Sequence, residues 1–190
     1  MSNSHHDHMH IVIAPDPIFS VKTTPVASVT DDVRATVDAM FDVLYREKGV
    51  GIGANMVGIT DRIAVVDLQE DGGNQPLALI NPVITSTGGD IEIATEASLS
   101  FPGVNAQIPR PTEVGLSYVD RDGKACELTA DGWLSRVIQH EIDYLDGKTF
   151  LDHLSPMKRK MFMKKYQKFR KHQQRHAGHG CGDPTCDIEH

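Results

Sequence analysis

The stretch QHEIDYLDG, at residues 139–147, carries a histidine and an acid in a spacing typical of metal-binding helices. His140 and Glu141 begin an H-E-x-x-H pattern, in which two histidines four positions apart share one helix face and hold a metal ion. The glutamate of such a helix acts as a general base on a metal-bound water. The position of the second histidine is occupied by Tyr144. The stretch therefore predicts the helix of a metal site that lacks one ligand.

Two further stretches bring glycines and polar side chains to the ends of predicted elements. GVGIGANM, at residues 49–56, is a glycine-rich turn entering a helix, and glycine lets the backbone approach a ligand closely. EASLSFPG, at residues 96–103, places polar side chains where a strand meets a loop. Each pattern alone has an ordinary structural interpretation, such as a turn, or a partly buried histidine beside a surface acid. Their combination favours a site.

In this order the three stretches resemble the peptide deformylase family, over roughly residues 10–175. The family motifs are G-Φ-G-x-A-A-x-Q, E-G-C-L-S and Q-H-E-x-D-H. Here they stand as G-V-G-I-G-A-N-M, E-A-S-L-S and Q-H-E-I-D-Y, and INP, RDGK…ELTADGW and LSPMKR are also similar to stretches of such proteins. The chain is identified from these motifs as a member of the family. The resemblance implies removal of the formyl group from the N-terminal methionine of nascent polypeptides by metal-activated water.

The resemblance also implies a role for individual residues. In the family, Fe²⁺ or Zn²⁺ is held by the cysteine of the second motif and both histidines of the third, whose glutamate activates the bound water. The glutamine of the first motif and the leucine amide of the second hold the formyl oxygen as it becomes an oxyanion. Carried over by position, the metal ligands are His140, Ser98 and Tyr144, the catalytic residue that activates the water is Glu141, and the substrate-binding residues are Gly49, Val50, Gly51, Met56 and Leu99.

Three of these positions have lost the chemistry that the family uses. Thiolate and imidazole are strong donors at neutral pH, whereas the hydroxyl of Ser98 stays protonated and the phenol of Tyr144 titrates near pH ~10. The thioether of Met56 donates no hydrogen bond, and losing one oxyanion donor typically costs on the order of 10²–10³ in rate. We therefore expect no metal or a weakly bound divalent metal, Fe²⁺ or Zn²⁺, and impaired or absent deformylase activity.

Two other interpretations of the site stay open. His140 could be an ordinary helix residue hydrogen-bonded to Glu141, Tyr144 or Ser98. Alternatively, a Ser/His/Tyr site could bind a different metal, because a phenolate can ligate ferric iron, and the chain would then be an active deformylase or amide hydrolase with unusual ligation. Between residues 11 and 152 the only histidine is His140 and the only cysteine is Cys126, so this part of the chain offers no obvious replacement ligand.

The elements that must position these residues predict an α+β fold with one largely antiparallel sheet around the H-E-x-x-Y helix. A helix is expected over residues 31–48, where apolar side chains recur at helical spacing, and another from Asp131 to Gly147. The other predicted elements are strands at 62–68 and 76–85, a turn at 84–90, a strand from Ile91 and a hairpin over 112–130. We expect residues 1–175 to form one domain.

Composition indicates a soluble globular protein whose charge is unevenly spread. The net charge of −7 divides into −13 for residues 1–152 and +6 for residues 153–190. No apolar run approaches the ~20 residues of a membrane span. The His-rich segment at residues 1–10 has neither a signal core nor a transit pattern. We expect a cytoplasmic protein without a membrane partner, and the sequence leaves its oligomeric state open.

The C-terminus carries two features of its own. Residues 155–175 predict a basic helix, and in the family such a helix docks on the ribosome, so the resemblance implies contact with rRNA through residues 156–175. Beyond it, an irregular tail at 176–190 departs from the family pattern. It holds the possible zinc ligands His176, His179, Cys181, Cys186 and His190, whose spacing matches no standard zinc module. A further interpretation is therefore a ribosome- or metal-binding protein that acts through its C-terminus.

Overall fold

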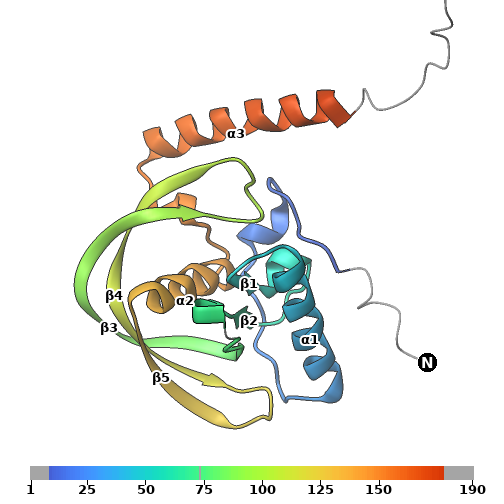
Figure 1. Cartoon of the computed structure of the whole chain (residues 1–190), viewed down its shortest axis with the longest axis vertical. Coiled ribbons are helices and arrows are strands. Elements are labelled where there is room, and N and C mark those ends of the chain that lie inside the picture. The colour runs from blue at the N-terminus through green and yellow to red at the C-terminus, as the bar shows by residue number, and fades with distance from the viewer. Residues whose placement is uncertain (1–8, 73, 178–190) are drawn as a thin grey trace, which may run out of the picture.

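A curled antiparallel sheet surrounds a central helix in the computed structural model, which describes residues 9–72 and 74–177 (Figure 1). The sheet has five strands in the order β1-β2-β3-β4-β5, and each pairs antiparallel with its neighbour. The strands are β1 (Gly51–Gly53), β2 (Ile63–Val66), β3 (Leu77–Ala97), β4 (Asn105–Val119) and β5 (Ala125–Asp131). The α+β fold class expected from the sequence is confirmed.

β3 and β4 form a long ribbon that bends, and here the sequence prediction was partly wrong. The chain does not turn over residues 84–90 but continues as one strand, with register shifts between Ile84 and Ser86 and between Gly88 and Ile91. Such bulges bend a strand and increase its twist, which explains the glycines and small polar residues at this place. The first half of β4 was also missed, because Pro109 and Pro111 argue against a strand interior. They are tolerated because β5 pairs only with residues 113–119 of β4.

Helix α2 (Gly132–Leu145) lies inside the curl of the sheet and carries the H-E-x-x-Y motif (Figure 1). Apolar side chains such as Ile138, Ile142 and Leu145 bury it against the strands. Its buried face also includes Arg136, Gln139, His140 and Glu141. Burying polar and charged groups is costly unless each finds a partner, so these side chains must be bonded to the protein or directed at a ligand.

Helix α1 (Asp31–Arg46) covers the other side of β1 and β2 (Figure 1). Thr30 is its N-cap, and the side chain of Thr30 accepts a hydrogen bond from the amide of Val33. Two aspartates in the first turn interact favourably with the helix dipole and stabilise the helix. Its apolar stripe, with Met40 and Leu44 fully buried, packs on the core. None of the described helices is long and apolar enough to cross a membrane.

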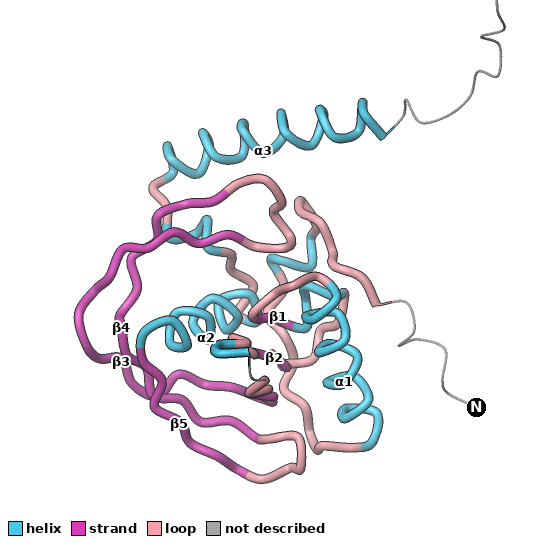
Figure 2. Tube along the Cα trace, viewed as in Figure 1, coloured by secondary structure: helices cyan, strands magenta, loops and turns pink. Residues whose placement is uncertain are grey.

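Helix α3 (Pro156–Ala177) crosses the outside of the body, above the end of the β3–β4 ribbon (Figure 2). The hydroxyl of Tyr166, which is fully buried, donates to the carbonyl of Ala14 at 2.7 Å, and Arg170 donates to the same carbonyl at 2.7 Å. The ring of Phe162 packs edge-on against Phe101. The apolar face of the basic helix is therefore docked on the domain.

Candidate functional site

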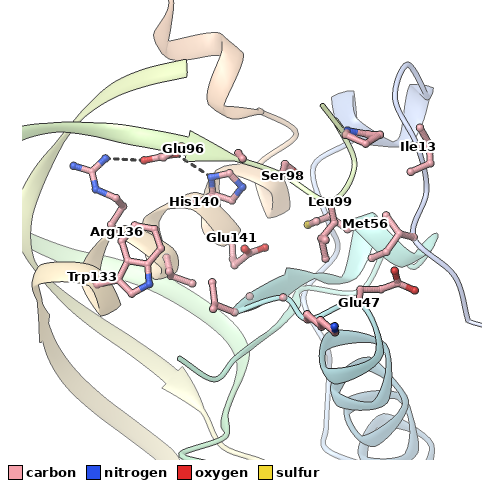
Figure 3. Close-up of a pocket in the computed structure, with 18 residues that line it drawn as sticks. Ile13, Glu47, Met56, Glu96, Ser98, Leu99, Trp133, Arg136, His140 and Glu141 are labelled. Atoms are coloured by element: carbon pink, nitrogen blue, oxygen red, sulfur yellow. Dashed lines mark hydrogen bonds and ion pairs between the residues drawn. The ribbon is translucent and has the colours of Figure 1, made fainter. Parts of the chain in front are cut away.

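A cavity of about 550 Å³ beside α2 gathers residues from all three sequence motifs (Figure 3). One wall comes from Ile11 and Ile13, a second from residues 47–51, a third from the loop after β3, and the floor from α2. Of the predicted site residues, the cavity is lined by Gly49, Val50, Gly51, Met56, Ser98, Leu99, His140 and Glu141. A cavity of this volume suits a small molecule or the end of a peptide.

His140 is fixed by a buried acid that the sequence interpretation missed. Its Nδ1 lies 2.9 Å from Oε2 of Glu96, a carboxylate that also accepts hydrogen bonds from Arg110 at 2.6 and 3.0 Å and from Arg136 at 2.8 Å. Burial alone would raise the pKa of Glu96, but the hydrogen bonds from His140 and Arg110 prevail and lower the pKa to about 2. An ionised carboxylate only accepts hydrogen bonds, so Nδ1 of His140 is the donor in this contact.

This contact corrects one of the interpretations drawn from the sequence. The expected hydrogen-bond partners of His140 were Glu141, Tyr144 or Ser98, and the partner is Glu96. Glu96 opens the EASLS stretch and lies 44 positions before His140. The strand period places it on the inward face, because its neighbours Thr95 and Ala97 are exposed. This alternation is visible only in the folded structure, so no local sequence signal identified Glu96 as the partner.

Ser98 and Tyr144, at the positions of two family metal ligands, are bonded to each other. The Tyr144 hydroxyl donates to Oγ of Ser98 at 2.8 Å, and Oγ also accepts from the amide of Ser100 at 3.2 Å. Tyr144 is fully buried, and this burial raises the pKa of its phenol far above the ordinary range. The phenol therefore stays neutral at physiological pH. His140 lies beside it, with 5.2 Å between the two ring centroids.

The donor set does not fit the Fe²⁺ or Zn²⁺ that the family resemblance implies. Those ions favour thiolate, imidazole and carboxylate donors, and here one imidazole is joined by a neutral hydroxyl and a neutral phenol. No three His, Cys, Asp or Glu side chains gather as metal ligands within the described part of the chain. Of the tail ligands, His179, Cys181, Cys186 and His190 lie outside the described residues, and only the backbone of His176 is described. Tail metal binding stays a prediction.

Glu141 is the second buried acid of the site and lacks a full set of partners. It is 3% exposed, and its Oε2 has no hydrogen-bond partner. Burial raises the pKa of Glu141 to about 7, against the opposing influence of His140 and the amide of Gly53. A glycine at position 51 is required for this placement, because a Cβ there would lie 2.6 Å from Oε1 of Glu141. The backbone of β1 thus packs directly on the acid.

The cavity walls around these groups are mainly apolar. Met56 is 1% exposed, and its carbonyl accepts a hydrogen bond from the amide of Val12 at 2.8 Å. Trp133, in the first turn of α2, lines the same cavity and remains 46% exposed. The sequence interpretation missed Trp133, although its position seven residues before His140, about two helical turns, places it on the same face of the helix.

Comparison with known proteins decides the family. The polypeptide deformylase family model matches residues 8–160. The chain belongs to the peptide deformylase family. A peptide deformylase-like protein of Rickettsia conorii is 46% identical over 180 residues, covering 94% of this chain and 98% of that protein. A peptide deformylase of Alkalilimnicola ehrlichii is 40% identical over 160 residues, covering 84% and 89%. The crystal structure of peptide deformylase from Ehrlichia chaffeensis superposes with a TM-score of 0.82 at 33% identity, covering 87% and 98%. The resemblance stated from the motifs is confirmed.

We expect Glu96→Ala to destabilise the protein strongly, by about 3–5 kcal/mol, because it leaves the buried guanidinium of Arg136 without its buried acid. Chemical denaturation at pH 7 measures the effect. Glu92→Ala is the matched control, since Glu92 also pairs with Arg136, at 3.5 Å, but its side chain is 58% exposed. It should change stability by less than about 1 kcal/mol. Equal effects of the two substitutions would contradict the role of Glu96 as the buried hub.

Proposed function

We propose that the chain keeps a deformylase-type pocket for the N-terminal methionine of a peptide but is impaired or inactive as a metallohydrolase. The observation that carries this proposal is the 2.8 Å hydrogen bond between Tyr144 and Ser98. Both stand where the family resemblance places metal ligands, and neither offers an anionic donor. The imidazole of His140 alone does not make up a tetrahedral donor set.

The remaining groups are weak substitutes for the family's chemistry. Water without metal activation keeps its bulk pKa near ~15.7, so a base of the strength of Glu141 generates very little hydroxide. The formyl oxygen would find the Leu99 amide but no donor from Met56, which is an apolar wall residue here. We therefore expect formyl-Met peptides to be hydrolysed at least several orders of magnitude more slowly than by an active relative.

Retention of the pocket is supported by its size and walls. The cavity measures about 550 Å³, and its lining includes the apolar side chains of Val50, Leu99 and Val137. These walls suit an apolar first side chain such as methionine. Nascent polypeptides in the cytoplasm, the substrates implied by the family resemblance, are accordingly the peptides that we propose as partners.

The test combines metal analysis with a deformylation assay. Metal stoichiometry is compared between the intact protein and His140→Ala, so that any metal on the His-rich termini cancels. We expect no difference in stoichiometry and only residual turnover of formyl-Met-Ala-Ser that chelator leaves unchanged. One extra equivalent in the intact protein, with chelator-sensitive turnover within about tenfold of an active relative, would instead establish the alternative of an active enzyme with unusual ligation.

A second function, contact with a polyanion such as rRNA through residues 156–175, is favoured by the way α3 is docked. Phe162 and Tyr166 are buried against the body, while the lysines of the helix lie in solvent. The exposed lysines are Lys158, Lys160, Lys164, Lys165, Lys168 and Lys171. Residues 1–152 carry a net −13, so any polyanion would be repelled by the rest of the molecule.

A further inference from the structure

The buried acid Glu141 faces the cavity without a counter-ion. Its Oε2 has no hydrogen-bond partner, and no arginine or lysine forms an ion pair with it among the described residues. Figure 3 shows its carboxylate turned toward the space between His140 and Met56. Two basic side chains line the cavity, and neither is paired with Glu141. Arg136 is held by Glu96, and Lys48 is exposed. A buried carboxylate in this position favours a ligand that brings a positive charge.

Few side chains around Glu141 are free to donate a hydrogen bond to a ligand. Nδ1 of His140 is committed to Glu96. The side chains of Met56 and Leu99 add no donor, and the Tyr144 hydroxyl is committed to Ser98. A ligand carbonyl, such as that of a formyl group, finds few partners here. An ammonium group finds the carboxylate of Glu141, and hydrogen bonds between charged groups are the strong ones.

We propose that this cavity binds the free, unformylated amino terminus of a peptide whose first side chain is apolar. Glu141 is the counter-ion of the ammonium group. The inference rests on the proposed function, because the cavity must still admit a peptide N-terminus. A formyl group converts the ammonium into a neutral amide, so the site discriminates against the formylated peptide. The chain thereby recognises the product of deformylation in preference to its substrate.

The single tryptophan of the chain makes this preference measurable. Trp133 lines the same cavity, so its fluorescence reports occupancy. The full chain is titrated at pH 7 in the presence of chelator with the amides of Met-Ala-Ser, formyl-Met-Ala-Ser and acetyl-Met-Ala-Ser. The α-amino group is largely protonated at this pH. We expect the free amine to bind about tenfold to a hundredfold more tightly than either acylated peptide. Methioninamide, as a fourth ligand, separates recognition of the amino group from contacts with the following residues.

Two variants test whether Glu141 is the residue that causes the preference for the free amine. Glu141→Gln keeps the shape of the side chain and removes its charge, so it should weaken binding of the free amine at least tenfold and change binding of the formyl peptide by less than about threefold. Glu127→Gln is the control, because Glu127 is exposed on β5, outside the residues that line the cavity, and its substitution alters the net charge equally. It should shift either affinity by less than about threefold. Thermal unfolding confirms that each variant is folded.

The possible failures are distinguishable. Ammonium recognition is refuted if the formyl peptide binds as tightly as the free amine, or if Glu141→Gln leaves the affinity for the free amine unchanged. Neither result contradicts the proposal that the peptide pocket is retained. If none of the peptides binds at millimolar concentration, by fluorescence or by calorimetry, the retained pocket itself is refuted, and ammonium recognition with it. The comparison of ligands on the unaltered chain needs no variant, so it decides the proposal even if Glu141→Gln fails to fold.

Discussion

Combining Ser98→Cys, Tyr144→His and Met56→Gln in one chain should create a metal site and raise deformylation of formyl-Met peptides by several orders of magnitude. The backbone already brings these positions together. The Tyr144 hydroxyl lies 2.8 Å from Oγ of Ser98, and the ring centroids of His140 and Tyr144 are 5.2 Å apart. The substitutions supply a thiolate, a second imidazole and an oxyanion donor. Glu141 lines the same cavity and would serve as the base. Metal stoichiometry and turnover before and after chelation are the measurements.

Single substitutions are the controls for this gain. Each of the three alone leaves the ligand set or the oxyanion site incomplete, so each should recover little, and the combined effect should far exceed the sum. Tyr144→Phe removes the hydrogen bond to Ser98 without adding a ligand and should yield neither metal binding nor turnover. A triple variant that is folded but binds no metal would show that these three side chains are not sufficient to account for the proposed loss of metal binding.

The sequence predicted the site's positions better than its contacts. The spacing of His140 and Tyr144 placed both on one face of α2, and the structure brings Ser98 to that face. Local periodicity suffices for such a prediction because the residues share one helix or lie next to a motif. Long-range partners such as Glu96 and Arg110 depend on the register of β3 against β4, which local pattern does not determine.

The bend in the β3–β4 ribbon was mispredicted for a related reason. Gly88 and Gly89 resemble a turn when only neighbouring residues are considered. The strand continues through them because β4 pairs with it on both sides of the bulge, from Ile80 with Val119 to Ala97 with Asn105. This continuation carries Glu96 and Ser98 to the cavity. The error in the fold and the missed partner of His140 therefore have one origin.

Truncation of α3 would be a poor test of its basic face. Tyr166 is fully buried and bonded to Ala14, and Phe162 packs on Phe101, so removing the helix also exposes the wall that positions Ile13 and the loop after β3. A chain ending after Leu154 would lose binding and stability together. Substitutions on the outer face separate the two, because side chains on the outside of α3 make no contact with the core.

Changing Lys160, Lys164, Lys168 and Lys171 to Gln should weaken binding to ribosomes or single-stranded RNA at least tenfold at low salt. The four side chains are exposed and fall in one sector of the helix, since successive residues rotate by ~100°. Each lysine that contacts a phosphate releases a counterion. The slope of log affinity against log salt concentration should therefore become less steep by about 3 if all four lysines make contact. Co-sedimentation over a salt series measures both quantities.

The matched control for this experiment changes Lys22, Lys48, Lys124 and Lys148 to Gln, which alters the net charge equally at exposed positions away from α3. Since the body carries −13 and repels polyanions, these four lysines add little local attraction, and the control should bind within about threefold of the unaltered chain. Comparable losses in the two variants would mean that only net charge matters. Absence of binding by the unaltered chain at low salt would mean that the lysine-rich face of α3 is simply solvated, and that the docked inner face is the reason for the helix.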